Sequence, residues 1–155
     1  MKLNEYELTL VADKLKLKKV KQHTHDTDSV ETVLEFLLDY YNLENSPIER
    51  AFVLSYDANS EFNGYMQVGI GDHKNVEFNL STCFRFLLLN NAHGCIFVHN
   101  HPKGSSINAS TDDMLVYSTL KYVCSALNIT LFNNIILQDY WHYYDFNKGG
   151  MEEFS

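Results

Sequence analysis

GCIFVHNHPKG (residues 94–104) and, a few positions later, STDD (residues 110–113) are the most informative part of this 155-residue chain. The apolar run before the first histidine is short and continuous, which is typical of a strand covered on both faces. His99 and His101 stand two positions apart at the end of this strand, so their side chains point to the same side. The proline and glycine that follow predict a sharp turn. The sequence therefore predicts a buried strand that brings two imidazoles to one point.

The STDD segment predicts the start of a helix whose first turn returns toward these histidines. An aspartate in that turn would complete a two-histidine, one-carboxylate set and leave a fourth zinc position for water. Zinc lowers the pKa of such a water toward neutrality, and a general base, usually a carboxylate, must then come from elsewhere in the chain. The same letters also match a capping box, with Ser110 at the N-cap and Asp113 three residues later. The residues alone leave both interpretations open.

A second H-x-H pair, His23 and His25 with Asp26 after it, has no such surroundings. No buried strand precedes it, and no turn with an acidic helix start follows it. We interpret this pair as part of a loop. His73, His93 and His142 have no evident partners in the sequence and are expected to be structural or solvated.

The rest of the chain alternates strand and helix patterns without a repeat or linker. Lysines alternate with apolar residues at 14–21, and we favour an edge strand that its lysines protect from edge-to-edge pairing over a basic patch for an acidic partner. The pattern predicts further strands at 50–57, 65–68, 94–99, 130–137 and 141–146, and helices at 30–41 after an Asp28-Ser29 cap, from Ser81 or Thr82 to 90–91, and from Ser110 to 127. This mixture predicts an α/β fold of the α+β type, a mixed sheet with helices packed against it.

Composition limits the possible functions. Twenty acidic against twelve basic residues give a net charge of -8, whereas nucleic-acid binding relies on cationic side chains that neutralise phosphates. The chain begins without the apolar core of a signal peptide, and no apolar run approaches the about 20 residues that cross a bilayer. Cys83, Cys95 and Cys124 are odd in number and far apart, which indicates reduced thiols. We expect a cytoplasmic protein without a membrane segment.

The H-N-H-P-x-G segment with the later S-x-x-D resembles the JAMM metal-binding signature of JAB/MPN metallopeptidase domains. It most resembles the RadC-like branch, whose members carry an H-N-H-P-S-G version. Further similar segments lie at residues 53–57, 84–85, 91–98, 127–129 and 134–137, so the resemblance spans about residues 28–146. It implies a JAB/MPN (cytidine-deaminase-like) architecture. We expect residues 1–27 to form an N-terminal strand and loop extension, and residues 28–155 the RadC-like domain.

The resemblance also implies roles for single residues. The metal histidines of the family fall on His99 and His101, and its metal aspartate falls on Asp113. Its serine, which stabilises the tetrahedral intermediate, falls on Ser110. Its catalytic glutamate, counted back from the aspartate that ends the first strand, falls on Glu49. One Zn²⁺ per chain is implied as the cofactor.

Two departures from the family pattern bear on these positions. The loop after the proline is one residue longer here, so strict counting would select Asp112 as the ligand and put Ala109 at the serine position. Glu49 could also be an ordinary surface charge beside Arg50. The helix-hairpin-helix region of full-length RadC proteins has no counterpart in this chain, which further weakens a DNA-binding role.

The resemblance implies a zinc-dependent hydrolase of the JAMM type that cleaves a peptide or isopeptide bond in a peptide or protein substrate. One alternative is a catalytically silent scaffold that keeps the fold and assembles with partners. Another is an accessory protein of DNA repair, for which the lysines at 14–21 would be the contact surface. The sequence does not indicate an oligomeric state.

Overall fold

A computed structural model of the chain describes residues 1–24, 29–71 and 78–155. It confirms the predicted α/β fold, a mixed eight-stranded sheet in the order β2-β1-β4-β3-β5-β6-β7-β8. The strands are β1 (Lys2–Val11), β2 (Lys14–Thr24), β3 (Arg50–Tyr56), β4 (Phe62–Ile70), β5 (Gly94–Asn100), β6 (Thr130–Leu137), β7 (His142–Asp145) and β8 (Gly150–Glu153). The helices are α1 (Val30–Tyr40), α2 (Leu80–Leu89) and α3 (Thr111–Ala126), and η1 (Leu43–Asn45) is a short 3-10 turn.

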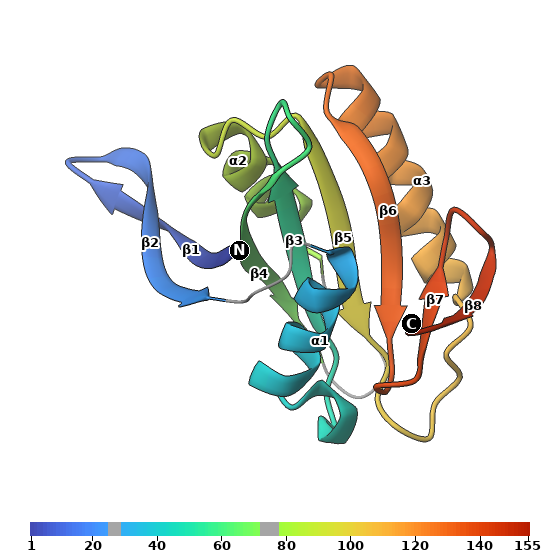
Figure 1. The fold of residues 1–155 in the computed structure, drawn as a ribbon. Coiled ribbons are helices and arrows are strands. Elements are labelled where there is room, and N and C mark those ends of the chain that lie inside the picture. Colours follow the sequence, from blue (N-terminus) through green and yellow to red (C-terminus); the bar gives the residue numbers. More distant parts are fainter. Residues whose placement is uncertain (25–28, 72–77) are drawn as a thin grey trace.

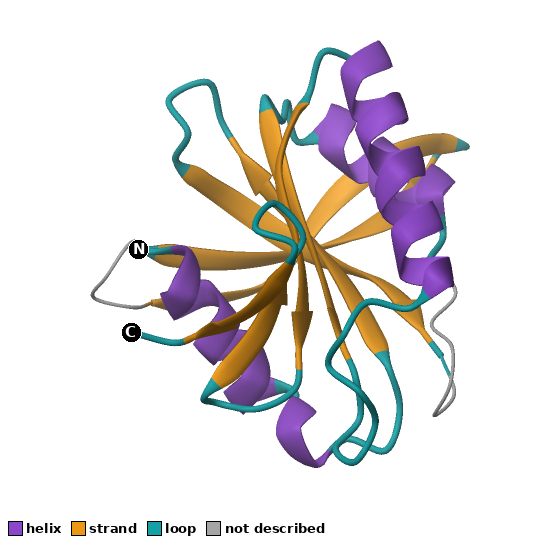
Figure 2. Ribbon diagram, turned by 90° about the vertical axis from the view of Figure 1, so that its right-hand side faces the viewer, coloured by secondary structure: helices purple, strands orange, loops and turns teal. Residues whose placement is uncertain are grey.

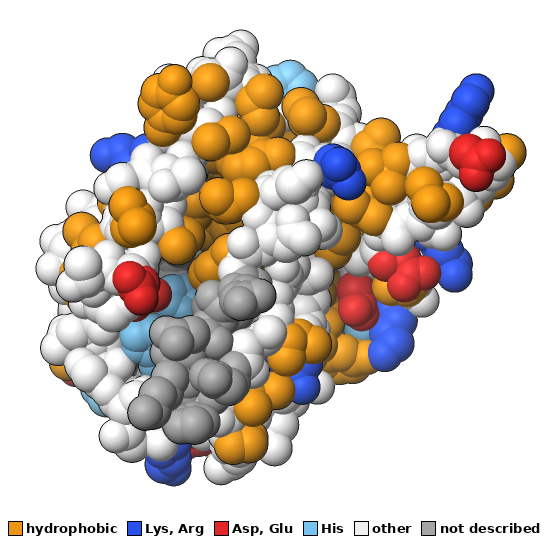
Figure 3. All heavy atoms as spheres, turned by 180° about the vertical axis from the view of Figure 1, so that it is seen from behind, with side chains coloured by type: hydrophobic (Ala, Val, Ile, Leu, Met, Phe, Trp, Pro, Cys, Tyr) orange, Lys and Arg blue, Asp and Glu red, His pale blue; other side chains and the backbone are white. Residues whose placement is uncertain are grey.

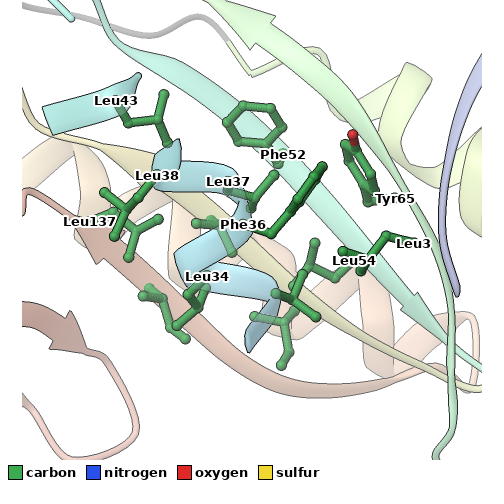
Figure 4. Close-up of a cluster of buried hydrophobic side chains, with 14 of the residues drawn as sticks. Leu3, Leu34, Phe36, Leu37, Leu38, Leu43, Phe52, Leu54, Tyr65 and Leu137 are labelled. Atoms are coloured by element: carbon green, nitrogen blue, oxygen red, sulfur yellow. The ribbon is translucent and has the colours of Figure 1, made fainter. Parts of the chain in front are cut away.

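The sheet separates two layers of helices and two apolar clusters. Helix α1 covers one face, and α2 and α3 cover the other (Figures 1 and 2). On the first face, Leu34, Leu37 and Leu38 of α1 pack with Phe52 and with other buried side chains of the strands (Figure 4). On the second face, α2 and α3 pack over the opposite sides of β3 and β5. The central strands are therefore buried on both faces, which accounts for their nearly continuous apolar sequences.

The middle of the sheet positions the candidate site. Strand β3 pairs antiparallel with β4 and with β5, and β5 pairs parallel with β6. All seven residues of β5 are buried, as the apolar run predicted. In the β3–β5 register Ala51 lies opposite His99, so the last residues of β5 lie beside the first residues of β3.

The helix caps agree with the sequence in two cases of three. Ser29 caps α1 by accepting a hydrogen bond from the backbone N–H of Thr32 at 3.1 Å, while Asp28 lies outside the described residues. The prediction that Ser81 or Thr82 caps the second helix was wrong. The cap is Asn79, whose side chain accepts from Thr82 N at 3.0 Å, so both predicted residues lie inside the first turn. Asparagine caps at least as well as serine, and the local pattern fitted either start.

The two ends of the chain form the two edges of the sheet. Strands β1 and β2 make a hairpin that extends away from the body (Figure 1), and β2, with the predicted lysines, is the outermost strand. The register pairs β1 with β4 at Glu5 and Tyr65, near the base of this hairpin. Strands β1 and β8 were not predicted from the sequence. Strand β8 is only four residues long and begins at a glycine directly after a turn, so its sequence shows no alternation typical of a strand.

The three cysteines are free and buried between the sheet and helices α2 and α3. Their thiols are close together, with the Sγ atoms of Cys95 and Cys124 3.7 Å apart. Apolar side chains gather on the face that α2 and α3 cover (Figure 3). Leu88 of α2 and Leu115 and Tyr122 of α3 are among the exposed large apolar residues. None of the helices in the described ranges has the length and apolar character that a membrane span requires.

Candidate metal centre

The two histidines of the H-N-H segment lie side by side at the end of β5. Their Nε2 atoms are 3.2 Å apart, and the residues are 1% (His99) and 7% (His101) exposed. His101 N donates to Leu137 O of β6 at 2.8 Å, which continues the β5–β6 pairing past the end of β5. Its Nδ1 lies 2.7 Å from the carbonyl oxygen of Ser106. A carbonyl only accepts, so Nδ1 carries the proton, and Nε2 of the neutral ring keeps a lone pair for a metal.

Asp113 reaches the same point from the first turn of α3. Its Oδ1 lies 3.1 Å from Nε2 of His99, and its Oδ2 lies 3.4 Å from Nε2 of His101. The Asp113 side chain is 12% exposed, whereas Asp112 is an exposed residue. Of the two aspartates that the sequence left as alternatives, the structure brings Asp113 to the histidines.

These three side chains fit a metal ion. Zinc binds imidazole nitrogen and carboxylate oxygen at about 2.0–2.2 Å in tetrahedral geometry, which separates neighbouring ligand atoms by about 3.3 Å. The separations of 3.2, 3.1 and 3.4 Å between the facing atoms match that spacing. The group consists of His99, His101 and Asp113, and together they can hold a metal ion.

The charges of the group depend on one another. Burial raises the pKa of the Asp113 carboxyl, but hydrogen bonds from His101 and His99 lower it by more, so this pKa lies well below its usual range. Burial lowers the pKa of His101, but its hydrogen bonds to Asp113 and to the Ser106 carbonyl, with the nearby charges of Asp113 and Glu49, raise it above the ordinary value. A metal ion that binds here must displace the proton that His101 donates to Asp113, because metal ligands bind deprotonated.

Ser110 is the N-cap of α3 and completes a capping box with Asp113. Its Oγ accepts from Asp113 N at 3.1 Å, and both its N–H and its O–H donate to Asp113 Oδ2 at 2.7 Å. The sequence left the capping and metal interpretations as alternatives. In the structure they involve the same carboxylate, because Oδ2 closes the cap and both oxygens face the histidines.

Glu49 lies directly before β3 and is 7% exposed, so it is not an ordinary surface charge. The β3–β5 register, continued past Ala51 and His99, puts Glu49 level with His101 and on the same face of the sheet. Its negative charge contributes to the raised pKa of His101. The structure thus brings all five residues of the predicted site to one end of the central strands.

Three neighbours of the histidines were missed from the sequence. The Ser106 carbonyl fixes the His101 ring. The Phe78 ring lies edge-on to His99, with ring centroids 5.6 Å apart. The Asn100 side chain forms hydrogen bonds to the backbone on both sides of Glu49. A backbone carbonyl leaves no trace in a sequence. Asn100 had one signal, its place between two histidines at the end of a buried strand.

Three other histidines, His23, His93 and His142, are among the described residues and do not belong to this group. His23 is in β2, not in a loop as predicted, and its ring packs on Phe36 and Tyr40 with centroids 4.8 Å apart. The strand was missed there because the H-x-H spacing by itself favours no element. His25, Asp26 and His73 lie outside the described residues. His93 is exposed, and His142 Nδ1 lies 3.3 Å from Asp139.

No curated protein matches the chain. The sequence model of the RadC-like JAB domain matches residues 27–151, which include β3 to β7 and all three helices. The hairpin of β1 and β2 precedes the matched range. With this match over most of its length, the chain belongs to the RadC-like JAB domain family.

Proposed function

We propose that this protein is a zinc-dependent hydrolase of the JAMM type that cleaves a peptide or isopeptide amide bond. The observation that carries the proposal is the convergence of His99, His101 and Asp113 at separations of 3.1–3.4 Å, with the buried Glu49 beside them. Two imidazoles and one carboxylate leave a coordination position open, which is the pattern of catalytic zinc sites. Membership of the JAB family, which includes metalloproteases, supports the same reaction class.

Each residue has a role that follows from its position. His99, His101 and Asp113 would hold Zn²⁺, which when bound supplies Lewis-acid polarisation of the scissile carbonyl and lowers the pKa of its water. Glu49 would accept the proton of that water and return it to the leaving amine, because it is buried directly before β3 and its charge acts on His101, although it does not belong to the ligand set.

Ser110 would stabilise the oxyanion of the tetrahedral intermediate. In the structure its hydroxyl proton is donated to Asp113 Oδ2. A hydroxyl has a single proton, so donation to substrate requires that this hydrogen bond opens. Asp113 then keeps the hydrogen bond from Ser110 N at 2.7 Å, and the helix cap survives the exchange.

We propose a peptide or protein rather than a nucleic acid as the substrate. The net charge of -8 disfavours binding to phosphates. The lysines of β2 lie at the far edge of the sheet, separated by β1, β4 and β3 from the strand that carries the histidines.

The test combines metal analysis with an amide-hydrolysis screen. Protein purified without chelator is expected to hold about one zinc per chain, and to lose it in His101→Ala. Hydrolysis of a peptide library and of lysine-linked isopeptides is expected to fall about 10²–10⁴-fold in Glu49→Gln, while the variant, assayed with zinc in excess, still binds the metal. Glu61→Gln, which alters an exposed glutamate in the β3–β4 turn, is the matched control. Zinc binding with no cleavage of any amide would favour the scaffold alternative.

A further inference from the structure

Asn100 lies between the two histidines and is fully buried. Its side chain does not point at the metal group but reaches sideways to the neighbouring strand. Asn100 Oδ1 accepts from Arg50 N at 2.7 Å, and Asn100 Nδ2 donates to Ile48 O at 3.1 Å. One side-chain amide therefore holds the backbone on both sides of Glu49.

These bonds extend the pairing of β3 with β5 beyond its end. The last paired residues in this direction are Ala51 and His99. Beyond this pair the side-chain amide of Asn100 makes the hydrogen bonds that a neighbouring strand would make, since it offers a donor and an acceptor in one plane as a peptide unit does. On the opposite side Gly71 N donates to Glu49 O at 2.9 Å, so the Glu49 backbone is held from both sides.

We propose that Asn100 is a positioning residue that fixes the Glu49 carboxylate relative to the metal group. This inference rests on the function proposed above, in which Glu49 is the general base. A general base must lie within hydrogen-bond reach of the proton it accepts, and small displacements of a catalytic group cost large factors in rate. Because Asn100 sits on the segment that carries both histidines, a single residue sets the spacing between the base and two ligands.

The residue type follows from this role. Aspartate at position 100 would keep the acceptor for Arg50 N but lose the donor to Ile48 O, and it would add a charge beside the ligands. Serine is too short to span both backbone groups. Asparagine satisfies both buried groups without a net charge, as buried polar groups require.

The experiment has two readouts, neither of which is catalysis. The first is amide hydrogen exchange in metal-free protein. Asn100→Ala is expected to speed exchange of the Arg50 amide at least 10-fold relative to that of Phe52, because Arg50 N loses its acceptor. The matched control is Asn90→Ala, which removes a buried asparagine bonded to Ser55 Oγ and Asn63 O, away from the metal group, and which is expected to leave Arg50 unchanged.

The second readout is Co²⁺ affinity, followed by the visible absorption of the bound ion. Outer-shell residues change metal affinity by about 10–100-fold, and both Glu49→Gln and Asn100→Ala are expected to weaken binding about 10-fold. If Asn100 acts through Glu49, its replacement in the Glu49→Gln background adds less than a factor of two. Asn90→Ala is expected to bind Co²⁺ as the unmodified protein does.

The inference is overturned by three results: unchanged Arg50 exchange in Asn100→Ala, an equal loss of affinity in both Glu49 backgrounds, or no change of affinity in either single variant. A protein that meets both expectations yet cleaves no amide keeps the positioning role of Asn100 and loses the proposed reaction. The two failures are therefore distinguishable.

Discussion

Replacing Asp113 with asparagine removes a negative charge that belongs to the candidate metal group and lies in the first turn of α3. In the structure the carboxylate accepts from the two histidines and from Ser110. Hydrogen bonds to charged groups contribute about 1.5–3 kcal/mol against about 0.5–1.5 kcal/mol for neutral ones. Since the amide keeps one acceptor oxygen, we expect a loss of about 2 kcal/mol of unfolding free energy. For a chain of this size that is a fall of about 4–8 °C in Tm.

The effect on metal binding is expected to be larger. Asp113 is one of the three ligands of the proposed site. Its replacement should therefore lower the affinity for Zn²⁺ or Co²⁺ by more than about 100-fold, the largest effect expected of outer-shell changes. Asp112→Asn is the matched control, because it removes the same charge from the same turn at an exposed position. This variant should lose about 0.3–1 kcal/mol of unfolding free energy, because a negative charge near the N-terminus of α3 is removed, and its metal binding should be unchanged.

Thermal unfolding with and without metal, together with a competitive metal titration, measures both effects. If Asp112→Asn abolished metal binding while Asp113→Asn preserved it, the assignment of the ligand would be refuted. Equal stability losses in the two variants would refute the argument that the contacts of Asp113 with the histidines stabilise the metal-free fold.

Three further predictions use other features of the site and the core. The pKa of His101 is raised by Asp113, so this pair contributes stability that is complete below the ordinary histidine pKa of about 6.5 and is lost as pH rises through the raised value. Metal binding would strengthen over the same pH range, because the ligands lose their protons. The free energy of unfolding in urea should therefore fall with rising pH in metal-free protein and rise with pH in metal-loaded protein. Slopes of the same sign would contradict the ion pair of His101 with Asp113. Ser110→Ala should lower the free energy of unfolding by about 1 kcal/mol, because the N-cap of α3 is lost. Elemental analysis should still find zinc in this variant, and loss of the metal would mean that the cap also holds Asp113 in place. A Cβ added at Gly94 would lie 2.2 Å from the Phe132 ring, so Gly94→Ala should cost about 1–3 kcal/mol in chemical denaturation, and an unchanged midpoint would show that the ring yields freely.

Local features of the site could be predicted because they depend on short-range geometry. The two-residue spacing of His99 and His101 at the end of an apolar run requires them to share a face of a strand, and the structure has them 3.2 Å apart. Ser110 and Asp113 have capping-box spacing, and the structure contains that capping box. The alternation of lysines in 14–21 indicated an edge, and β2 is the outermost strand.

Other features depended on contacts between distant segments. The start of α2 at Asn79 could not be separated from starts at Ser81 or Thr82, since all three side chains can cap. Strand β1 was missed because its sequence mixes charged and apolar residues, and its position is set by pairing with β2 and β4. The role of Asn100 could not be seen either, because its partners are backbone atoms about fifty positions earlier.

The chemical groups of the candidate site could be predicted from the sequence, because residue types and their spacing along one strand or one helix turn are local properties. How these groups meet depends on the packed fold. The parallel register of β5 with β6, the antiparallel register of β5 with β3 and the return of α3 together bring Asp113, and not Asp112, to the histidines, and Glu49 level with His101. Strand register and helix placement result from burial of two apolar faces at once, so they are properties of the whole packed chain rather than of any segment.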